Sequence, residues 1–161
     1  MIIREYNPKD KEAVLKCIVE LQEFERTLEA DRIEGSKMAE EYLDYLLSEK
    51  DKQNPQILLA EENAIVTGFI SFWIEDDDVA EIAVTSHKYL YISDISVPPQ
   101  YQKIGVGEAL MKKAEEFAVS QKIAMIKVYV LARNKGAADF YHRLGYRDYE
   151  MGLVKELNKD S

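Results

Sequence analysis

The spacing of apolar residues along this chain alternates between the period of a helix and that of a strand. They begin with a short strand-like stretch at residues 1–5 and then recur every three or four positions across residues 14–24, which predicts an amphipathic helix. Asn7 and Pro8 precede that helix, and the pair is typical of a helix cap followed by proline in the first turn. The same spacing predicts a second helix across residues 38–46, with Ser36 as its cap.

Strand-like patterns dominate the middle of the chain. Residues 56–60 and 65–74 are apolar runs separated by the turn-forming residues 61–64, so they predict a hairpin. An acidic cluster at residues 75–78 interrupts this meander. Residues 79–84 fit neither the helical nor the strand pattern clearly.

Strands and helices alternate in the second half of the chain. A strong strand is predicted at residues 89–97, stopped by the two prolines that follow it, and an amphipathic helix at residues 108–121. Three further elements are then predicted, in the order strand, helix and strand: residues 124–131, 135–144 and 149–157. This order predicts a mixed α/β fold of the α+β kind, in which a single domain of residues 1–161 is built around a central, partly antiparallel sheet.

Composition and charge narrow the function classes. The chain of 161 residues has 47% hydrophobic and 32% charged residues, as ordinary soluble globular proteins do. Its net charge of −9 disfavours a nucleic-acid partner and suits a cationic one. The single cysteine, Cys17, excludes an internal disulfide, and His87 and His142 show no metal-ligand spacing, so we expect no metal. We expect a cytoplasmic protein without a membrane partner, because no apolar run approaches the length of a membrane span and no export signal is visible.

A glycine-punctuated turn joins the strand at residues 89–97 to the helix that follows it. The turn reads Gln102-Lys103-Ile104-Gly105-Val106-Gly107. The first amides of a helix lack backbone partners and carry partial positive charge, so this junction is a candidate anion site. A dinucleotide loop would need glycine or alanine at Leu110, and a triphosphate loop would need Lys at Glu108, so neither pattern fits. On local spacing alone, a purely structural tight turn remains an equal alternative.

A second motif lies downstream, at residues 134–141, and is followed by Gly145. Taken alone, its aromatic pair Phe140 and Tyr141 would belong to a core, with Gly145 as a helix C-cap. Together with the glycine turn, it resembles the GCN5-related N-acetyltransferase (GNAT) superfamily. The resemblance covers nearly the whole chain in element order, and its specific part spans residues 89–146.

The resemblance implies acetyl-coenzyme A (acetyl-CoA) as the cofactor and acyl donor. It also implies a mostly antiparallel mixed sheet with helices on both faces, whose strands 89–97 and 124–131 are parallel and splay apart around the cofactor. The implied contacts are main-chain groups of Ile95 and Val97 for the pantetheine arm, Asn134 near that arm, and Phe140 packed along the cofactor. The pyrophosphate would lie on the turn formed by Gln102, Lys103, Ile104, Gly105, Val106 and Gly107.

Acetyl transfer to an amine needs a base for the amine and an acid for the thiolate leaving group. The family match makes Tyr141 the acid. Asp94 is the one carboxylate in its strand, but Ser93 stands where many polyamine-type members carry Glu, so Asp94 is a base, a steering group or a structural residue. Phe24 and Glu25 lie in a segment loosely similar to the diamine acetyltransferase subgroup and are candidates for substrate binding; a solvated helix face is the alternative.

The predicted function is therefore transfer of an acetyl group from acetyl-CoA, by direct attack of a primary amine. The expected acceptor is a small molecule such as a polyamine, an aminoglycoside or an amino acid derivative. Two alternatives remain: a protein lysine or N-terminal acetyltransferase, and a non-catalytic acyl-CoA sensor. Family members are often dimers, so a homodimer is a further expectation.

Overall fold

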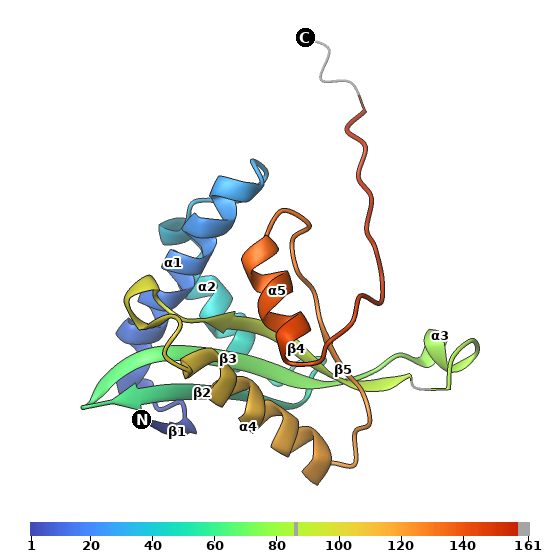
Figure 1. Ribbon diagram of the computed structural model, residues 1–161, viewed down its shortest axis with the longest axis horizontal. Helices are drawn as coiled ribbons and strands as arrows, with labels where there is room; N and C mark the ends of the chain where they lie inside the picture. The colour runs from blue at the N-terminus through green and yellow to red at the C-terminus, as the bar shows by residue number, and fades with distance from the viewer. Residues whose placement is uncertain (86, 158–161) are drawn as a thin grey trace.

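The computed structural model describes residues 1–85 and 87–157, and its described strands form one sheet (Figure 1). The strands lie side by side in chain order: β1 (Ile2–Glu5), β2 (Gln53–Glu62), β3 (Ile65–Asp76), β4 (Lys88–Ser96) and β5 (Ile126–Val128). Pairing is antiparallel from β1 to β4, and β5 joins β4 in parallel. The predicted mixed, mostly antiparallel sheet is confirmed.

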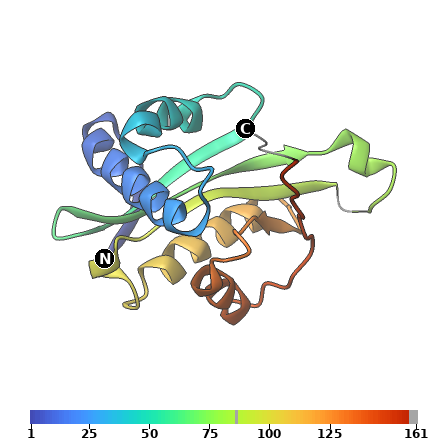
Figure 2. The ribbon, with the colours of Figure 1, turned by 90° about the horizontal axis from the view of Figure 1, so that it is seen from above.

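Helices cover both faces of this sheet (Figure 2). On one face lie α1 (Lys11–Leu28) and α2 (Gly35–Leu47), and on the other α4 (Val106–Ser120) and α5 (Lys135–Arg143). Strand β3 separates two cores: Phe69 and Trp73 pack toward α1 and α2, while Ile70 and Phe72 pack toward α4. This two-sided burial explains why β3 is an almost unbroken apolar run rather than an alternating one.

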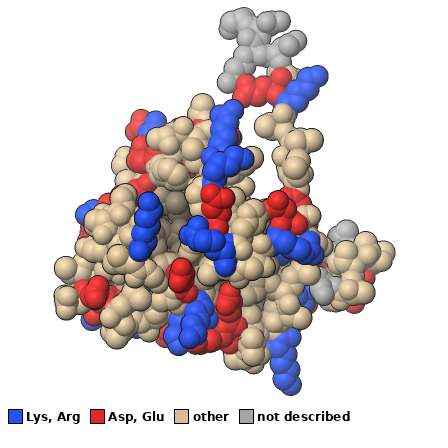
Figure 3. All heavy atoms as spheres, viewed as in Figure 1, with Lys and Arg blue, Asp and Glu red and all other residues tan. Residues whose placement is uncertain are grey.

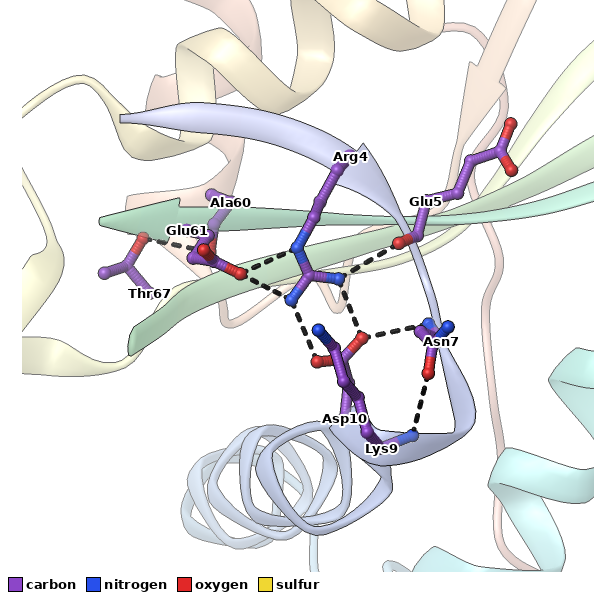
Figure 4. A network of polar contacts seen from close by, with 8 residues as sticks. All are labelled: Arg4, Glu5, Asn7, Lys9, Asp10, Ala60, Glu61 and Thr67. Atoms are coloured by element: carbon purple, nitrogen blue, oxygen red, sulfur yellow. Dashed lines mark hydrogen bonds and ion pairs between the residues drawn. The ribbon is translucent and has the colours of Figure 1, made fainter. Parts of the chain in front are cut away.

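The start of α1 is anchored to the sheet by an ionic cluster (Figure 4). Arg4 donates to both carboxylate oxygens of Asp10, at 2.7 and 2.9 Å, and its Nε donates to Glu61 on the neighbouring strand at 2.7 Å. Asn7 and Asp10 form a capping box around the 3₁₀ turn η1 (Pro8–Asp10), after which α1 begins. The predicted cap at Asn7 and the proline after it are therefore present, one turn before the α-helix proper.

Several predicted element boundaries differ from the structure, and the strand predicted at residues 124–131 is reduced to Ile126–Val128. Ser36 is not a cap, because α2 already begins at Gly35, whose missing side chain lets α2 approach the backbone of Val19 on α1. The hairpin turn at Asn63 and Ala64 is shorter than predicted, since both residues have positive φ and complete a two-residue turn. The ambiguous residues 79–84 overlap a single helical turn, α3 (Asp78–Glu81).

The closing strand predicted at residues 149–157 is wrong. This segment pairs with no strand and leaves the body of the molecule (Figure 1). Its start touches β5 through an ion pair between Lys127 and Glu150 at 3.6 Å, but Leu153 and Val154 are 90% and 92% exposed. The apolar alternation that suggested a strand has no sheet surface to cover, because β5 itself is only three residues long.

Within the described ranges, none of the helices offers the continuous apolar length that a membrane span requires.

Candidate active site

Strands β4 and β5 separate after three paired residues, and a large cleft lies where they separate. Pairing runs from Leu90 opposite Ile126 to Ile92 opposite Val128 and then stops. Beyond that point the two backbones diverge around an open cleft of ≈ 1210 Å³, lined by β4, the segment after β5, α1, the glycine turn and α5. The splayed parallel strands implied by the resemblance are present, and Ile95 and Val97 both line the cleft.

A β-bulge on β4 aims Asp94 toward the α1–α2 side of the sheet. Ser71 pairs with Asp94 and the next residue, Phe72, pairs with Ile92, so Ser93 is an extra residue without a partner on β3. Side chains alternate between faces along a regular strand, which would put Asp94 on the same face as Ile92. The bulge reverses this alternation and places both Ser93 and Asp94 on the opposite face.

Three hydroxyl groups converge on one oxygen of Asp94. Its Oδ2 accepts hydrogen bonds from Ser93 at 2.7 Å, from Tyr42 on α2 at 2.8 Å and from Ser71 on β3 at 3.1 Å. Burial raises the pKa of Asp94, and the three hydroxyl donors oppose that rise because they favour the charged carboxylate. Asp94 also lines the cleft, so it combines a buried oxygen with access to a bound ligand.

The glycine turn presents free amides at the start of α4. Gly105 is the residue before the helix, has a left-handed φ of 90°, and provides no side-chain cap. Lys103 also has positive φ, at 62°, and Gln102 is tied back to the carbonyl of Val97 at 2.8 Å. These three residues and Gly107 line the cleft, so the helix N-terminus opens into it.

The other residues of the glycine turn, Ile104, Val106 and Gly107, differ in exposure and packing. The side chain of Ile104 is exposed and that of Val106 is buried in the core, so only their backbone groups can serve the turn. Gly107 lies close to the ring of Phe140: a Cβ there would lie 3.1 Å from its Cζ, a tight contact that a small shift of the ring would relieve. Phe140 both lines the cleft and packs against the core. Its position is therefore compatible with a contact to the cofactor and with a place in the core.

Helix α5 brings the second motif to the same cleft. Asn134 caps the helix by accepting a hydrogen bond from the amide of Ala137 at 3.1 Å. Tyr141 is 6% exposed, and its hydroxyl makes no hydrogen bond within the described ranges 1–85 and 87–157. Burial and the charge of Asp94 raise the pKa of Tyr141, so the phenol stays protonated at neutral pH and can act as a donor.

The C-terminal half of α1 lines the opposite wall with acidic side chains. Phe24 is 48% exposed and, with Glu20 and Glu25, borders the cleft. Burial raises the pKa of Glu25, the nearby Arg32 guanidinium at 3.5 Å lowers it, and Asp94 adds a further upward contribution. Glu20 Oε2 is buried without a hydrogen-bond partner among the described residues. An acceptor with a positive charge would therefore meet carboxylates from two elements.

Sequence reasoning did not identify every residue at this site. Tyr42 and Ser71 appeared only as positions in a helix and a strand, and Tyr129 and Arg143, which also line the cleft, carried no motif. Within ranges 1–85 and 87–157, no group of three or more metal-ligating side chains is gathered. On the face shown in Figure 3, acidic and basic side chains are interspersed rather than segregated.

Comparison with known proteins assigns the fold and the family. The model of the acetyltransferase (GNAT) family matches residues 19–146. Thialysine N-epsilon-acetyltransferase of Sus scrofa is 28% identical over 92% of this chain and 85% of its own length. An uncharacterized N-acetyltransferase of Methanocaldococcus jannaschii is 30% identical over 71% of this chain, which spans 48% of that relative's length.

Solved structures share the architecture. A mutant of the BH1408 protein from Bacillus halodurans superposes with a TM-score of 0.84 at 21% identity, over 98% of this chain and 100% of that one. An aminoglycoside N-acetyltransferase in complex with CoA superposes with a TM-score of 0.69 at 15% identity, over 98% and 99%. Cleft geometry, family match and shared architecture agree: the chain belongs to the acetyltransferase (GNAT) family.

Proposed function

We propose that this protein transfers the acetyl group of acetyl-CoA to a primary amine of a small molecule. The observation that supports this proposal most strongly is the content of one cleft. An uncapped helix N-terminus opens into it at the glycine turn, and Asp94 and Tyr141 line the same space. An anion site and a pair of proton-transfer groups are the requirements of an acyl-CoA-dependent transfer.

The cleft fits the donor in its chemistry. Amides at the start of α4 suit a pyrophosphate, and Lys103 adds a cation beside them. Main-chain groups of Ile95 and Val97 border the gap where β5 no longer pairs with β4, so they suit the amides of a pantetheine arm. Asn134 lines the same cleft, with its side chain engaged as a helix cap.

The reaction follows from the two titratable groups. An alkylammonium acceptor, with a pKa near 10, must lose a proton before it can attack. Asp94 takes that proton, directly or through water, and the neutral nitrogen forms a bond to the thioester carbonyl carbon. The carbon–sulfur bond then breaks, Tyr141 gives its proton to the departing thiolate, and the second proton on nitrogen restores the tyrosine. The net products are the acetylated amine, coenzyme A and one proton.

A small cationic acceptor is favoured by the acidic wall. Glu20 and Glu25 on α1 and Asp94 on β4 present carboxylates to one cleft, and a desolvated carboxylate gains most from a cationic partner. The name of the Sus scrofa relative, which specifies thialysine, is consistent with an amino acid derivative bearing a side-chain amine.

The test is release of coenzyme A thiol in an amine panel containing polyamines, aminoglycosides, thialysine and lysine peptides. We expect turnover with small amines, and a large loss in Asp94→Asn. Turnover with peptides alone would favour the protein acetyltransferase alternative. Acetyl-CoA binding without turnover on any amine would favour a non-catalytic sensor and contradict the proposal.

A further inference from the structure

Three separate elements supply hydroxyl groups to a single carboxylate oxygen. Tyr42 comes from α2, Ser71 from β3 and Ser93 from the bulge on β4, and all three donate to Oδ2 of Asp94 within 3.1 Å. Tyr42 Oη also lies 3.3 Å from Ser93 Oγ, so the hydroxyls form one connected cluster. None of these residues has a role in the reaction as described above.

The other oxygen of Asp94, Oδ1, differs from Oδ2 in its hydrogen bonds. No described residue donates a hydrogen bond to Oδ1, although the residue lines the cleft. A carboxylate can accept several hydrogen bonds on each oxygen, so a purely structural aspartate would be expected to spread its donors over both. The observed arrangement saturates one oxygen and leaves the other for a group in the cleft.

We propose that Tyr42, Ser71 and Ser93 are positioning residues that fix Oδ2 of Asp94 and turn Oδ1 toward the amine of the acceptor. The proposal rests on the proposed function for the identity of that amine, but its contacts exist without a substrate. Of the three, Tyr42 is the one that couples the helix layer to the bulge. Its ring packs beside the core of α1 and α2, so the position of the hydroxyl that donates to Asp94 is fixed by packing.

The cluster also favours the charged form of this buried carboxylate. Hydrogen bonds to a charged group favour the charged form, so each hydroxyl lowers the pKa of Asp94 against the effect of burial. The described ionisable groups that interact electrostatically with Asp94 include Glu25 on α1, Tyr42 on α2, Tyr91 on β4 and Tyr141 on α5. Glu25 is the carboxyl among them, and it is unchanged in the variants below.

The experiment is an NMR titration of the Asp94 carboxyl carbon in the full-length protein, with Asp94→Asn used to assign the signal. Losing the Tyr42 hydroxyl removes a hydrogen bond to a charged group, so Tyr42→Phe should raise the pKa of Asp94 by about one to two units. Ser71→Ala should raise it in the same direction and provides a second variant if Tyr42→Phe does not fold. Tyr45→Phe is the matched control, because that ring stacks on Tyr42 at 5.8 Å without contacting Asp94.

The pH dependence of kcat/KM is then measured for the same variants. An acid limb that moves to higher pH together with the NMR titration supports the proposal. It is overturned if Asp94 titrates in both Tyr42→Phe and Ser71→Ala as it does in Tyr45→Phe. A raised Asp94 pKa with an unmoved acid limb supports the positioning contact and contradicts the base role of Asp94, so failure of the proposed function is distinguishable.

Discussion

Substituting Gly105 by alanine tests the backbone geometry on which the anion site depends. Gly105 has a φ of 90°, and a Cβ there would meet no atom within 4 Å, so the cost is conformational rather than steric. A left-handed conformation costs an L-residue about 1–2 kcal/mol relative to glycine. In a chain of this size, about 1 kcal/mol corresponds to a shift of about 2–4 °C in Tm, so Gly105→Ala should lower Tm by about 2–8 °C.

Acetyl-CoA provides the second half of this test. A ligand at 100 times its Kd stabilises the native state by about 2.7 kcal/mol, which predicts a rise in the wild-type Tm of about 5–11 °C. Relaxation of the strained turn in Gly105→Ala would move the amides that we propose as the pyrophosphate site, so that rise should shrink. Differential scanning fluorimetry with and without acetyl-CoA measures both effects.

Gly107→Ala is the matched control for stability, because its backbone is helical and the nearest atoms to its added Cβ are at the outer edge of the Phe140 ring, at 3.1 Å from Cζ. We expect little loss of stability, since a gain of about 0.5–1 kcal/mol in helix propensity offsets the displacement of that ring. An unchanged Tm and an unchanged acetyl-CoA response in Gly105→Ala would refute the reasoning about the turn.

Three further outcomes are expected. Tyr141→Phe should lower kcat by about 10²–10⁴-fold if the phenol is the general acid, with the Kd of acetyl-CoA in calorimetry unchanged; equal turnover would remove Tyr141 from the mechanism. Arg4 lowers the pKa of Asp10 below its ordinary value of 3.8, so this pair stabilises the fold above that pH and the contribution is lost as pH falls below it. The free energy of unfolding of Arg4→Met, measured in urea, should therefore depend less on acid pH. An identical pH profile would contradict the assignment. Truncation after Gly152 should leave Tm almost unchanged because the side chains removed among the described residues are exposed; a large drop would reveal a contact of this tail with another molecule.

The periodic spacing of apolar residues predicted the helices and strands that bury one face. The helix at α4 and the strand at β4 followed from apolar spacing, and the glycine turn was visible because only unusual backbone geometry needs glycine there. The residues 149–157 show the limit of this reasoning. Their alternation satisfies the strand pattern, but pairing depends on the length of a neighbouring strand, and β5 ends at Val128.

The hydroxyl cluster was invisible for a different reason. Tyr42 occupies a regular apolar position of α2, so its ring alone accounts for its place in the pattern, and the target of its hydroxyl lies 52 residues away. The bulge at Ser93 adds one residue and reverses the face on which Asp94 lies, a change that no spacing rule indicates. Side-chain chemistry across distant elements therefore needed coordinates.

The most direct test of the central claim is a crystal structure of the protein with acetyl-CoA. We predict that pyrophosphate oxygens accept hydrogen bonds from the amides of the glycine turn that opens α4. The thioester sulfur should lie within hydrogen-bonding distance of the Tyr141 hydroxyl, with the carbonyl carbon open to the side of Asp94 Oδ1. A pyrophosphate bound away from this turn, or a sulfur beyond the reach of Tyr141, would contradict the account.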